Sequence, residues 1–429
     1  MNQVMLSNQS LYSQISSLLL YQSVFKNEIG EAFLNLLDCL SYPEDDHLNL
    51  DCLIAYGELF NALAKQQKSW QDYLIDEILI NTNPFSEQIQ AVPLKNLPKS
   101  LIDAVKHDLS ILQKAYHCQP KEIAQWLKET IKKDSVTLAW ELDNNQDSFL
   151  HKSNDWQEVI EELANYYRQQ GTGIFAQYKA LKWYDNQLIG INNPDAVQLN
   201  EIVGYETQKA SLIKNTEILL AGYPALHVLL YGSRGSGKSS LVKGLLNQYS
   251  TQALRLIEVS KSQLKHLPFI VDKLRNISQK FIIFVDDLSF EEDDDAFKSL
   301  KVVLEGSVTA KAQNVVVYAT SNRRHLIKEF FGDRPQLSEA DEVHAWDTIQ
   351  EKLSFSDRFG LTLTFEPANQ EKYLNIVHHL AQQAGLNLPP EELEFKAKQW
   401  ATRHNGRSGR TARQFIDFLQ GELAIMNQI

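Results

Sequence analysis

The sequence predicts an α/β protein in which a five-stranded parallel sheet with flanking helices follows a mainly α-helical domain and precedes a small helical lid. Short apolar or β-branched runs alternate with helix-length segments in the middle of the chain, as in parallel sheets. Apolar residues on either side of this part recur at spacings of three and four, which is typical of helices. Turn-forming residues cluster where the first helical pattern ends.

Residues 1–195 are predicted to form the helical domain. Apolar residues recur at helical spacing in stretches such as Glu31–Leu40, Leu53–Ala64 and Trp156–Tyr167. The turn residues Asn192–Asp195 mark its expected end. We find no chemical constellation in this region, and we expect its tryptophans, such as Trp126, Trp140 and Trp156, to lie in the core. The domain is therefore interpreted as a binding site for an unidentified protein partner.

Five strand-like runs lie in the next domain, residues 196–366. They are His227–Tyr231, Leu254–Val259, Phe281–Val285, Val315–Ala319 and Leu361–Phe365. Helix-length segments separate the first four, which indicates a parallel sheet. Residues 367–429 then contain three helical segments, Asn369–Ala384, Glu391–His404 and Thr411–Met426, which we expect to form the lid.

Composition limits the classes of protein. The chain has 429 residues, of which 43% are hydrophobic and 22% charged, as in globular proteins with substantial cores. Its net charge of −12 gives no support to a broad nucleic-acid-binding surface. No apolar stretch approaches the roughly 20 residues of a membrane span. The widely spaced Cys39, Cys52 and Cys118 fit reduced thiols, and we expect a cytoplasmic protein.

The first predicted strand leads into a phosphate-binding motif. Residues 232–239 read GSRGSGKS, a full match to G-x-x-x-x-G-K-[ST]. Its glycines allow backbone N–H groups to point at phosphate oxygens, and the helix that follows offers a positive N-terminus. Lys238 is expected to reach the β- and γ-phosphates, and the Ser239 hydroxyl to ligate Mg²⁺. The predicted nucleotide-binding residues are Gly232, Ser233, Arg234, Gly235, Ser236, Gly237, Lys238, Ser239 and Ser240.

Seven acidic residues follow the strand Phe281–Val285. In P-loop ATPases the acid that holds Mg²⁺ comes at the end of a neighbouring strand. Asp286 is therefore expected to hold Mg²⁺, and Asp287 to orient or deprotonate the attacking water. The other five acids lie within residues 291–295, at or just before a helix, where negative charge favours the N-terminus. We interpret them as a solvated run rather than a second metal site.

A polar residue also ends the strand Val315–Ala319. The Asn322 amide both donates and accepts, so it could contact the γ-phosphate or hold the attacking water. The alternative is a turn residue that precedes a helix. We include Asn322 among the catalytic candidates.

Arginines complete the predicted site. Arg358 precedes the last strand, at the expected edge of the domain, where it could enter a neighbouring subunit's site as an arginine finger. Arg410 and Arg413 share one face of the last helix, and one of them could reach back to the phosphates. The alternatives are a surface arginine paired with an acid and an ordinary basic helix face.

In their order along the chain, these motifs resemble an AAA+ ATPase module. The chain more closely resembles a bacterial AAA+ family known only as domain of unknown function 815, over about Tyr166 to Gln420. The segments that carry this likeness are Leu230–Leu246, Phe281–Phe290, Tyr318–Leu326, Glu351–Phe365 and Arg407–Phe418. The resemblance implies binding and hydrolysis of ATP with Mg²⁺. Leu199–Tyr205 resembles the segment that receives adenine in that superfamily, which implies contacts from Ile202, Val203 and Gly204.

One residue departs from the common pattern, because most AAA+ motors have Glu where this chain has Asp287. An Asp-Asp pair also resembles the replication initiators and helicase loaders. We expect an ATPase whose AAA+ modules form a homo-oligomer, with ATP between subunits and Arg358 acting in trans, that remodels a partner. The alternative is a slowly hydrolysing, ATP-gated assembly switch, scaffold or loader. A P-loop kinase fits less well, because Asn322 and the lid arginines match the AAA+ pattern.

Overall fold

The computed structural model describes residues 10–41, 46–131, 138–142, 147–290, 295–305, 312–322, 355–404 and 406–426. The chain divides into two compact units, Met1–Gln177 and Tyr178–Ile429. Each unit has its own hydrophobic core. The division falls earlier than the predicted boundary at residue 195, because two strands that precede residue 195 belong to the sheet of the second unit.

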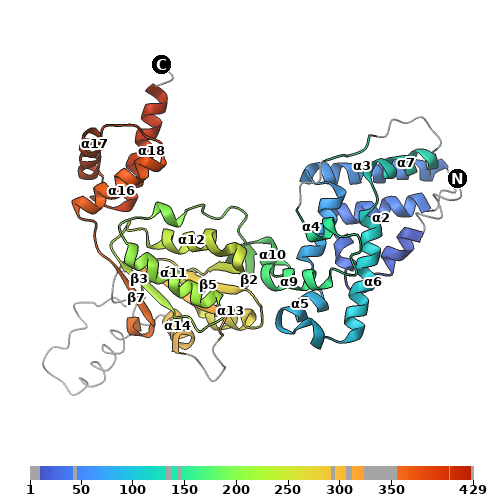
Figure 1. Cartoon of the computed structure of the whole chain (residues 1–429), viewed down its shortest axis with the longest axis horizontal. Helices are drawn as coiled ribbons and strands as arrows, with labels where there is room; N and C mark the ends of the chain where they lie inside the picture. The colour runs from blue at the N-terminus through green and yellow to red at the C-terminus, as the bar shows by residue number, and fades with distance from the viewer. Residues whose placement is uncertain are drawn as a thin grey trace. The chain divides into compact units, whose positions relative to one another are not determined.

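The first unit is helical in its described residues, as predicted (Figure 1). Its α-helices are α2 (Glu28–Ser41), α3 (Asp46–Gln66), α4 (Trp70–Ile80), α5 (Pro84–Ala91), α6 (Lys99–Tyr116), α7 (Pro120–Ile131), α8 (Phe149–Lys152), α9 (Ile160–Gln170) and α10 (Ile174–Gln177). The short 3₁₀ helices are η1 (Gln22–Phe25) and η2 (Leu94–Asn96). The amphipathic pattern of α2 explains the arrangement, because Phe33, Leu36, Leu37 and Leu40 all lie buried on one face.

Aromatic residues fill the core of this unit. The rings of Phe33 and Trp70 stack with centroids 3.9 Å apart. Trp156 is fully buried, and Trp126 and Trp140 are partly buried against the same core, as expected from the sequence. The thiols of Cys39, Cys52 and Cys118, all in the described residues, are free.

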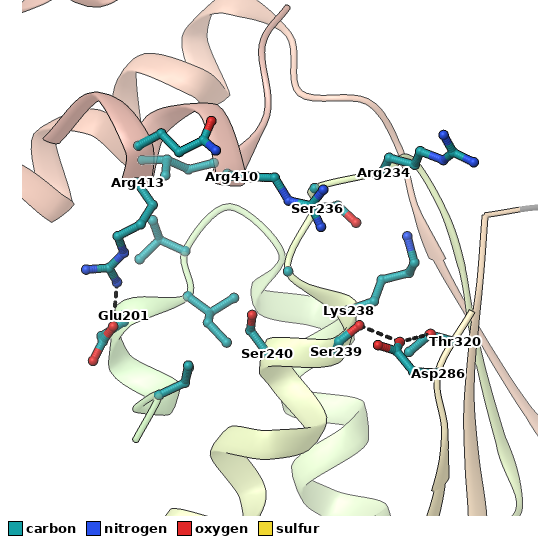
Figure 2. A pocket seen from close by; sticks show the side chains of 18 of the residues that line it. Glu201, Arg234, Ser236, Lys238, Ser239, Ser240, Asp286, Thr320, Arg410 and Arg413 are labelled. Atoms are coloured by element: carbon teal, nitrogen blue, oxygen red, sulfur yellow. Dashed lines mark hydrogen bonds and ion pairs between the residues drawn. The ribbon is translucent and has the colours of Figure 1, made fainter. Parts of the chain in front are cut away.

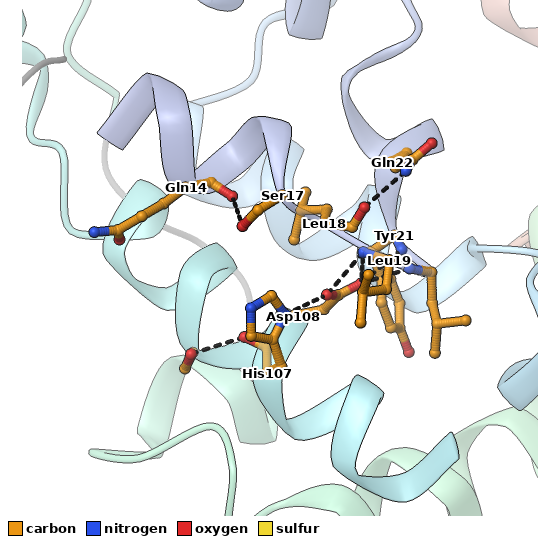
Figure 3. A network of polar contacts seen from close by, with 10 residues as sticks. Gln14, Ser17, Leu18, Leu19, Tyr21, Gln22, His107 and Asp108 are labelled. Atoms are coloured by element: carbon orange, nitrogen blue, oxygen red, sulfur yellow. Dashed lines mark hydrogen bonds and ion pairs between the residues drawn. The ribbon is translucent and has the colours of Figure 1, made fainter. Parts of the chain in front are cut away.

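A buried carboxylate fixes the beginning of the described chain to α6 (Figure 3). Asp108 is fully buried, and its oxygens accept hydrogen bonds from the backbone N–H groups of Leu19, Leu20 and Tyr21 at 2.7–3.0 Å. In the part of the chain that the structure describes, these three donors lie outside helices and strands, so the carboxylate serves as their acceptor. The contact joins residues almost 90 positions apart in sequence.

We expect Asp108→Ala to destabilise the first unit by about 3–5 kcal/mol, because it leaves the buried N–H of Tyr21 and the part-buried N–H groups of Leu19 and Leu20 without their acceptor. Chemical denaturation followed through the unfolding transition of that unit would measure the change. His107→Ala is the matched control, since the half-exposed His107 ring contacts the same carboxylate and its loss should cost less than about 1 kcal/mol. Equal effects of the two substitutions would refute the anchoring role.

The second unit is built on a seven-stranded sheet. Its strands are β1 (Ala180–Tyr184), β2 (Gln187–Gly190), β3 (Val228–Gly232), β4 (Leu254–Glu258), β5 (Lys280–Val285), β6 (Val315–Ser321) and β7 (Leu361–Phe365), in the order β2-β1-β4-β5-β6-β3-β7. All neighbours are parallel except β1 and β2. The predicted alternation of strands and helices is thus confirmed, and β6 is buried along its whole length, as parallel strands covered on both faces usually are.

The predicted number of five strands is wrong, because the β1–β2 hairpin adds two at one edge. Asp185 and Asn186 connect these strands, and both have positive φ, at 48° and 60°. This is the conformation of a tight two-residue hairpin turn. The order also corrects a second expectation: β6 lies between β3 and β5, so the acid-bearing strand is not the direct neighbour of the strand that precedes the phosphate-binding motif.

Helices complete the second unit. Those of the α/β part are α11 (Glu206–Leu220), α12 (Lys238–Tyr249), α13 (Leu267–Leu274) and α14 (Asp295–Glu305), with the 3₁₀ helices η3 (Leu199–Glu201), η4 (Ser250–Gln252), η5 (Lys261–His266) and η7 (Phe355–Arg358). One core cluster joins α11 and α12 to alternate residues of the sheet, such as Val228 and Leu230 of β3. Asp295 begins α14, whereas the predicted acidic run at 291–294 lies outside the described residues.

The lid consists of the three predicted helices, α16 (Gln370–Gln383), α17 (Pro390–Arg403) and α18 (Gly409–Met426). They enclose a core of their own around Tyr373, Leu380 and Phe415. The lid also contacts the α/β part, because His379 lies 2.7 Å from the carbonyl oxygen of Asn200 in η3. In the part of the chain that the structure describes, no helix is both long and apolar enough to cross a membrane.

Candidate functional site

The phosphate-binding motif forms a loop between β3 and α12. Gly232 has φ +133°, and a Cβ atom there would lie 2.1 Å from the carbonyl oxygen of Phe365, so a larger residue does not fit. The N–H of Ser233 donates to the same oxygen at 2.8 Å. Gly237 caps α12 in the left-handed conformation, with φ +89°. These glycines of the motif therefore adopt backbone conformations that a residue with a side chain could not adopt easily.

Lys238 is buried at the centre of this loop. Its ammonium donates to the carbonyl oxygens of Gly232 at 3.0 Å and Ser233 at 2.7 Å, and its Nζ lies 3.5 Å from Asn322 Oδ1. Burial lowers the pKa of the Lys238 ammonium, and the nearby carboxylates of Asp286 and Asp287 oppose this shift. The group is therefore a desolvated cation, held by loop carbonyls at the place where an anion is expected.

Asp286 joins the loop to the sheet (Figure 2). Its Oδ1 accepts hydrogen bonds from Ser239 Oγ at 2.6 Å and from Thr320 Oγ1 at 2.5 Å. A hydroxyl and a carboxylate that converge in this way provide the hard oxygen ligands that Mg²⁺ prefers. The residues present thus fit the predicted Mg²⁺ site. Among the described residues, no group of three or more His, Cys, Asp or Glu side chains could hold a metal ion.

Asp287 has an unusual backbone. Its φ of +51° lies in the left-handed region, which few residues other than Gly adopt, although Asp and Asn tolerate it best. Asn322 Nδ2 donates to Asp287 Oδ1 at 2.6 Å. The predicted water-activating acid and the predicted strand-tip amide are therefore in direct contact.

The two lid arginines point to different places (Figure 2). The backbone N–H of Arg410 donates to Gly235 O at 3.1 Å, and its side chain extends toward the loop at Ser236. Arg413 instead forms an ion pair with Glu201 of η3. Although both arginines are on one face of α18, Arg410 contacts the phosphate-binding loop, whereas Arg413 contacts the segment predicted to receive the base.

These residues surround a pocket of about 650 Å³, within the range of ordinary ligand sites. It is lined by Val197, Glu201, Ile202, Val203, Arg234, Gly235, Ser236, Gly237, Lys238, Ser239, Ser240, Asp286, Asp287, Thr320, Asn322, Ile376, Leu380, Gly409, Arg410, Arg413 and Gln414. One end contains the loop, the acids and Asn322. Apolar side chains from the η3 region and from α16 line another part.

Three predicted binding residues do not line this pocket. Gly232 and Ser233 contribute instead through their carbonyl oxygens, which accept hydrogen bonds from Lys238. Gly204 lines a separate hollow of about 470 Å³ and faces the stem of Lys372. Its φ of +87° is by itself a sufficient reason for a glycine at this position, so no contact with a ligand is needed to explain it.

Several lining residues were not predicted. Ile376 and Leu380 lie on α16, where helical spacing indicated only a face of the lid core. Glu201 and Thr320 are the other important ones, since each holds a charged site residue. A threonine two positions before Asn322 at the end of a β-branched strand was the available signal for Thr320.

Arg358 lies away from the pocket. It follows Asp357 in η7, and its Nε forms an ion pair with Glu305, the last residue of α14. Its side chain is 19% exposed. Because β7 and β3 are parallel, with Leu361 beside Val228 and Phe365 beside Gly232, Arg358 precedes one end of the strand pair and the phosphate-binding loop follows the other.

The sheet, the phosphate-binding loop and the helical lid together make the second unit an AAA+ P-loop module. The model of the family described as "Protein of unknown function (DUF815)" matches residues 176–423, more than half of the chain. The chain belongs to this family.

Solved structures similar to the chain include those of RuvB from Thermotoga maritima. One RuvB mutant is 17% identical, with a TM-score of 0.37, over 54% of this chain and 67% of that chain. The RuvB Holliday junction branch migration motor is 13% identical, with a TM-score of 0.31, over 52% and 72% of the two chains. Values this low assign no function to the present chain. No curated protein matches it.

Proposed function

We propose that this protein is an ATPase that binds Mg-ATP between the subunits of a homo-oligomer and uses hydrolysis to remodel an unidentified protein partner through its first unit. The observation that carries the proposal is the composition of the 650 Å³ pocket. It combines a buried lysine, the phosphate-binding loop and the adjacent carboxylates of Asp286 and Asp287 with an apolar surface and two lid arginines. This is the set of groups that a nucleoside triphosphate requires.

The phosphates fit the end formed by the loop. Lys238 is already desolvated there, so exchanging the carbonyls of Gly232 and Ser233 for phosphate oxygens would give it a stronger, charge-assisted contact. The N-terminus of α12 adds the positive end of a helix dipole. Arg410, which extends toward the loop, is the lid residue placed to meet phosphate charge.

The base fits the apolar part of the pocket. Val197, Ile202 and Val203 come from the region around η3, and Ile376 and Leu380 come from α16. A flat ring bound there would touch both the α/β part and the lid. Arg413 and Glu201 form an ion pair across the same two parts. Nucleotide binding would therefore hold the lid against the α/β domain, and release would free it to move.

The acid pair supports hydrolysis. Ser239 and Asp286 would hold Mg²⁺, which when bound neutralises phosphate charge and polarises the bond to be broken. Asp287 stands one residue further on, beside Asn322, and is the group available to orient the attacking water or accept its proton. Asn322 would hold the Asp287 carboxylate in position.

A second copy would supply Arg358. β7 spans roughly 13 Å at about 3.3 Å per residue, so Arg358 and the loop of its own chain are too far apart for contact. Arg358 is instead partly buried against Glu305 at the edge of the α/β part, and once released from Glu305 it would enter the pocket of another subunit. The alternative function is an ATP-gated switch, scaffold or loader with slow hydrolysis. Two contacts favour it, because Asp287 is held by Asn322 and Arg358 is paired with Glu305.

ATP binding and turnover per subunit, measured over a range of protein concentrations with the mass followed in parallel, would test the proposal. We expect turnover to rise as an oligomer assembles. Assembly in ATP with negligible turnover would favour the switch.

Lys238→Ala should weaken ATP binding roughly 10- to 100-fold, because it removes a charged hydrogen-bond donor. Lys243→Ala, which removes a lysine of the same helix that pairs with Asp195, should bind normally. Unchanged affinity in Lys238→Ala would contradict the site.

A further inference from the structure

We propose that Thr320 is a positioning residue that orients both acids of the site. It directs Asp286 toward the bound metal and Asp287 toward the attacking water. The inference rests on the proposed ATPase function and names a residue outside the phosphate-binding loop and the acid pair. Thr320 lies near the end of β6, is 2% exposed and lines the pocket.

One oxygen makes both contacts. Thr320 Oγ1 donates to Asp286 Oδ1 at 2.5 Å and accepts from the backbone N–H of Asp287 at 3.0 Å. Strand register explains this meeting, because Val285 of β5 pairs with Ala319 of β6 and the next residues along the two strands are Asp286 and Thr320. Only a hydroxyl can donate and accept from a single side-chain atom at this position.

The backbone around Asp287 depends on the same residue. The N–H of Leu288 donates to the carbonyl oxygen of Thr320 at 2.7 Å, and Ser321 Oγ donates to Leu288 O at 2.8 Å. With the Thr320 hydroxyl, these contacts hold Asp287 in its left-handed conformation. Such a conformation costs energy in any residue but glycine and persists only where neighbouring contacts enforce it.

This turn separates the two carboxylates. Asp286 faces Ser239 of the loop, whereas Asp287 faces Asn322. The left-handed backbone also accounts for Asp rather than Glu at 287, since Asp is among the residues that tolerate it best. Thr320 therefore directs one acid to the predicted metal site and its neighbour to the predicted water site.

Thr320→Val tests this role, because it keeps the branched shape and removes the hydroxyl. An unpaired Asp287 N–H and a less restrained Asp286 should weaken Mg²⁺-dependent ADP binding and lower ATP turnover, each roughly 10- to 100-fold. ADP binding in EDTA should remain within about twofold of the parent, because the phosphate-binding loop is intact. Thr320→Ser, which retains the hydroxyl, should stay close to the parent in both measurements.

Fluorescent ADP titrations with and without Mg²⁺, together with the melting temperature, separate the outcomes. Parent-like Mg²⁺ dependence in Thr320→Val would overturn the inference. Equal losses in Thr320→Val and Thr320→Ser would also overturn it, because the effect would then not depend on the hydroxyl. The same holds if Thr320→Val lowers metal-free ADP binding and the melting temperature enough to explain the whole effect. Failure of the parent protein to bind ATP would instead contradict the proposed function.

Discussion

Arg358→Ala is expected to lower the turnover of the assembled protein by roughly 10³- to 10⁵-fold, the range for removal of an arginine finger. Binding of ATP to each subunit should not change. The charge that develops on the transferred phosphoryl group would lose its stabilising cation, whereas the pocket of the same chain does not include Arg358. Turnover per subunit and ATP affinity, both measured above the assembly concentration, would provide the test.

The ion pair with Glu305 requires a control, because Arg358→Ala breaks it as well. Glu305→Gln removes the carboxylate and leaves the arginine. Glu305 is 42% exposed, so the pair should contribute no more than about 1 kcal/mol to stability. We expect Glu305→Gln to keep full turnover. A comparable loss in both variants would point to a structural role for the ion pair, and normal turnover in Arg358→Ala would remove it as the finger.

Mixed assemblies give a sharper result. Subunits that carry Lys238→Ala keep Arg358 but bind ATP poorly, and subunits that carry Arg358→Ala bind ATP but lack the finger. Neither should turn over ATP alone. Mixing them should restore part of the activity, because a Lys238→Ala subunit can supply its arginine to the intact pocket of an Arg358→Ala neighbour. Absence of any recovery in assemblies shown to be mixed would contradict action in trans.

Asp287→Asn is expected to lower turnover by roughly 10²- to 10⁴-fold, the usual contribution of a general base, while ATP and Mg²⁺ still bind. The amide has the size of the carboxylate, and its oxygen can still accept from Asn322 Nδ2. The change therefore removes the charge and the proton acceptor but keeps the geometry. Phosphate release in a single turnover, with the protein in excess over ATP and with saturating Mg²⁺, would measure it.

A surface carboxylate provides the matched control. Asp272 lies on α13, and its side chain is 73% exposed outside the pocket, so Asp272→Asn should leave both binding and turnover unchanged. Hydrolysis at the parent rate by Asp287→Asn would exclude Asp287 as the group that activates water. A parent protein that is already very slow would indicate the switch, and Asp287→Asn would then be judged by its effect on that residual rate.

Local signals in the sequence were sufficient for much of the second unit. The motif at 232–239 predicted the loop and the start of α12, because glycines at these positions meet backbone requirements that are set within a few residues. The runs that became β5 and β6 are apolar throughout, since both faces of these strands are buried. Asp286 could be placed at a strand end for the same reason.

The β1–β2 hairpin escaped prediction although its turn was visible at Asp185-Asn186. β2 is only partly buried, because it lies at the edge of the sheet, so its residues lack the strong apolar pattern of a central strand. The lid arginines present a similar limit. A spacing of three places Arg410 and Arg413 on one helix face, but Glu201, more than 200 positions away, determines which of them turns from the loop.

The class of fold, the phosphate-binding loop, the acid pair and the accompanying arginines could all be predicted from the order of residues, because each depends on residues close together in the chain. Three features required the folded chain: β6 lies between β3 and β5, Thr320 contacts both acids, and α16 lines the pocket. These contacts join residues that are distant in sequence. Their partners are chosen by strand order and side-chain packing, which a local pattern of residues does not encode.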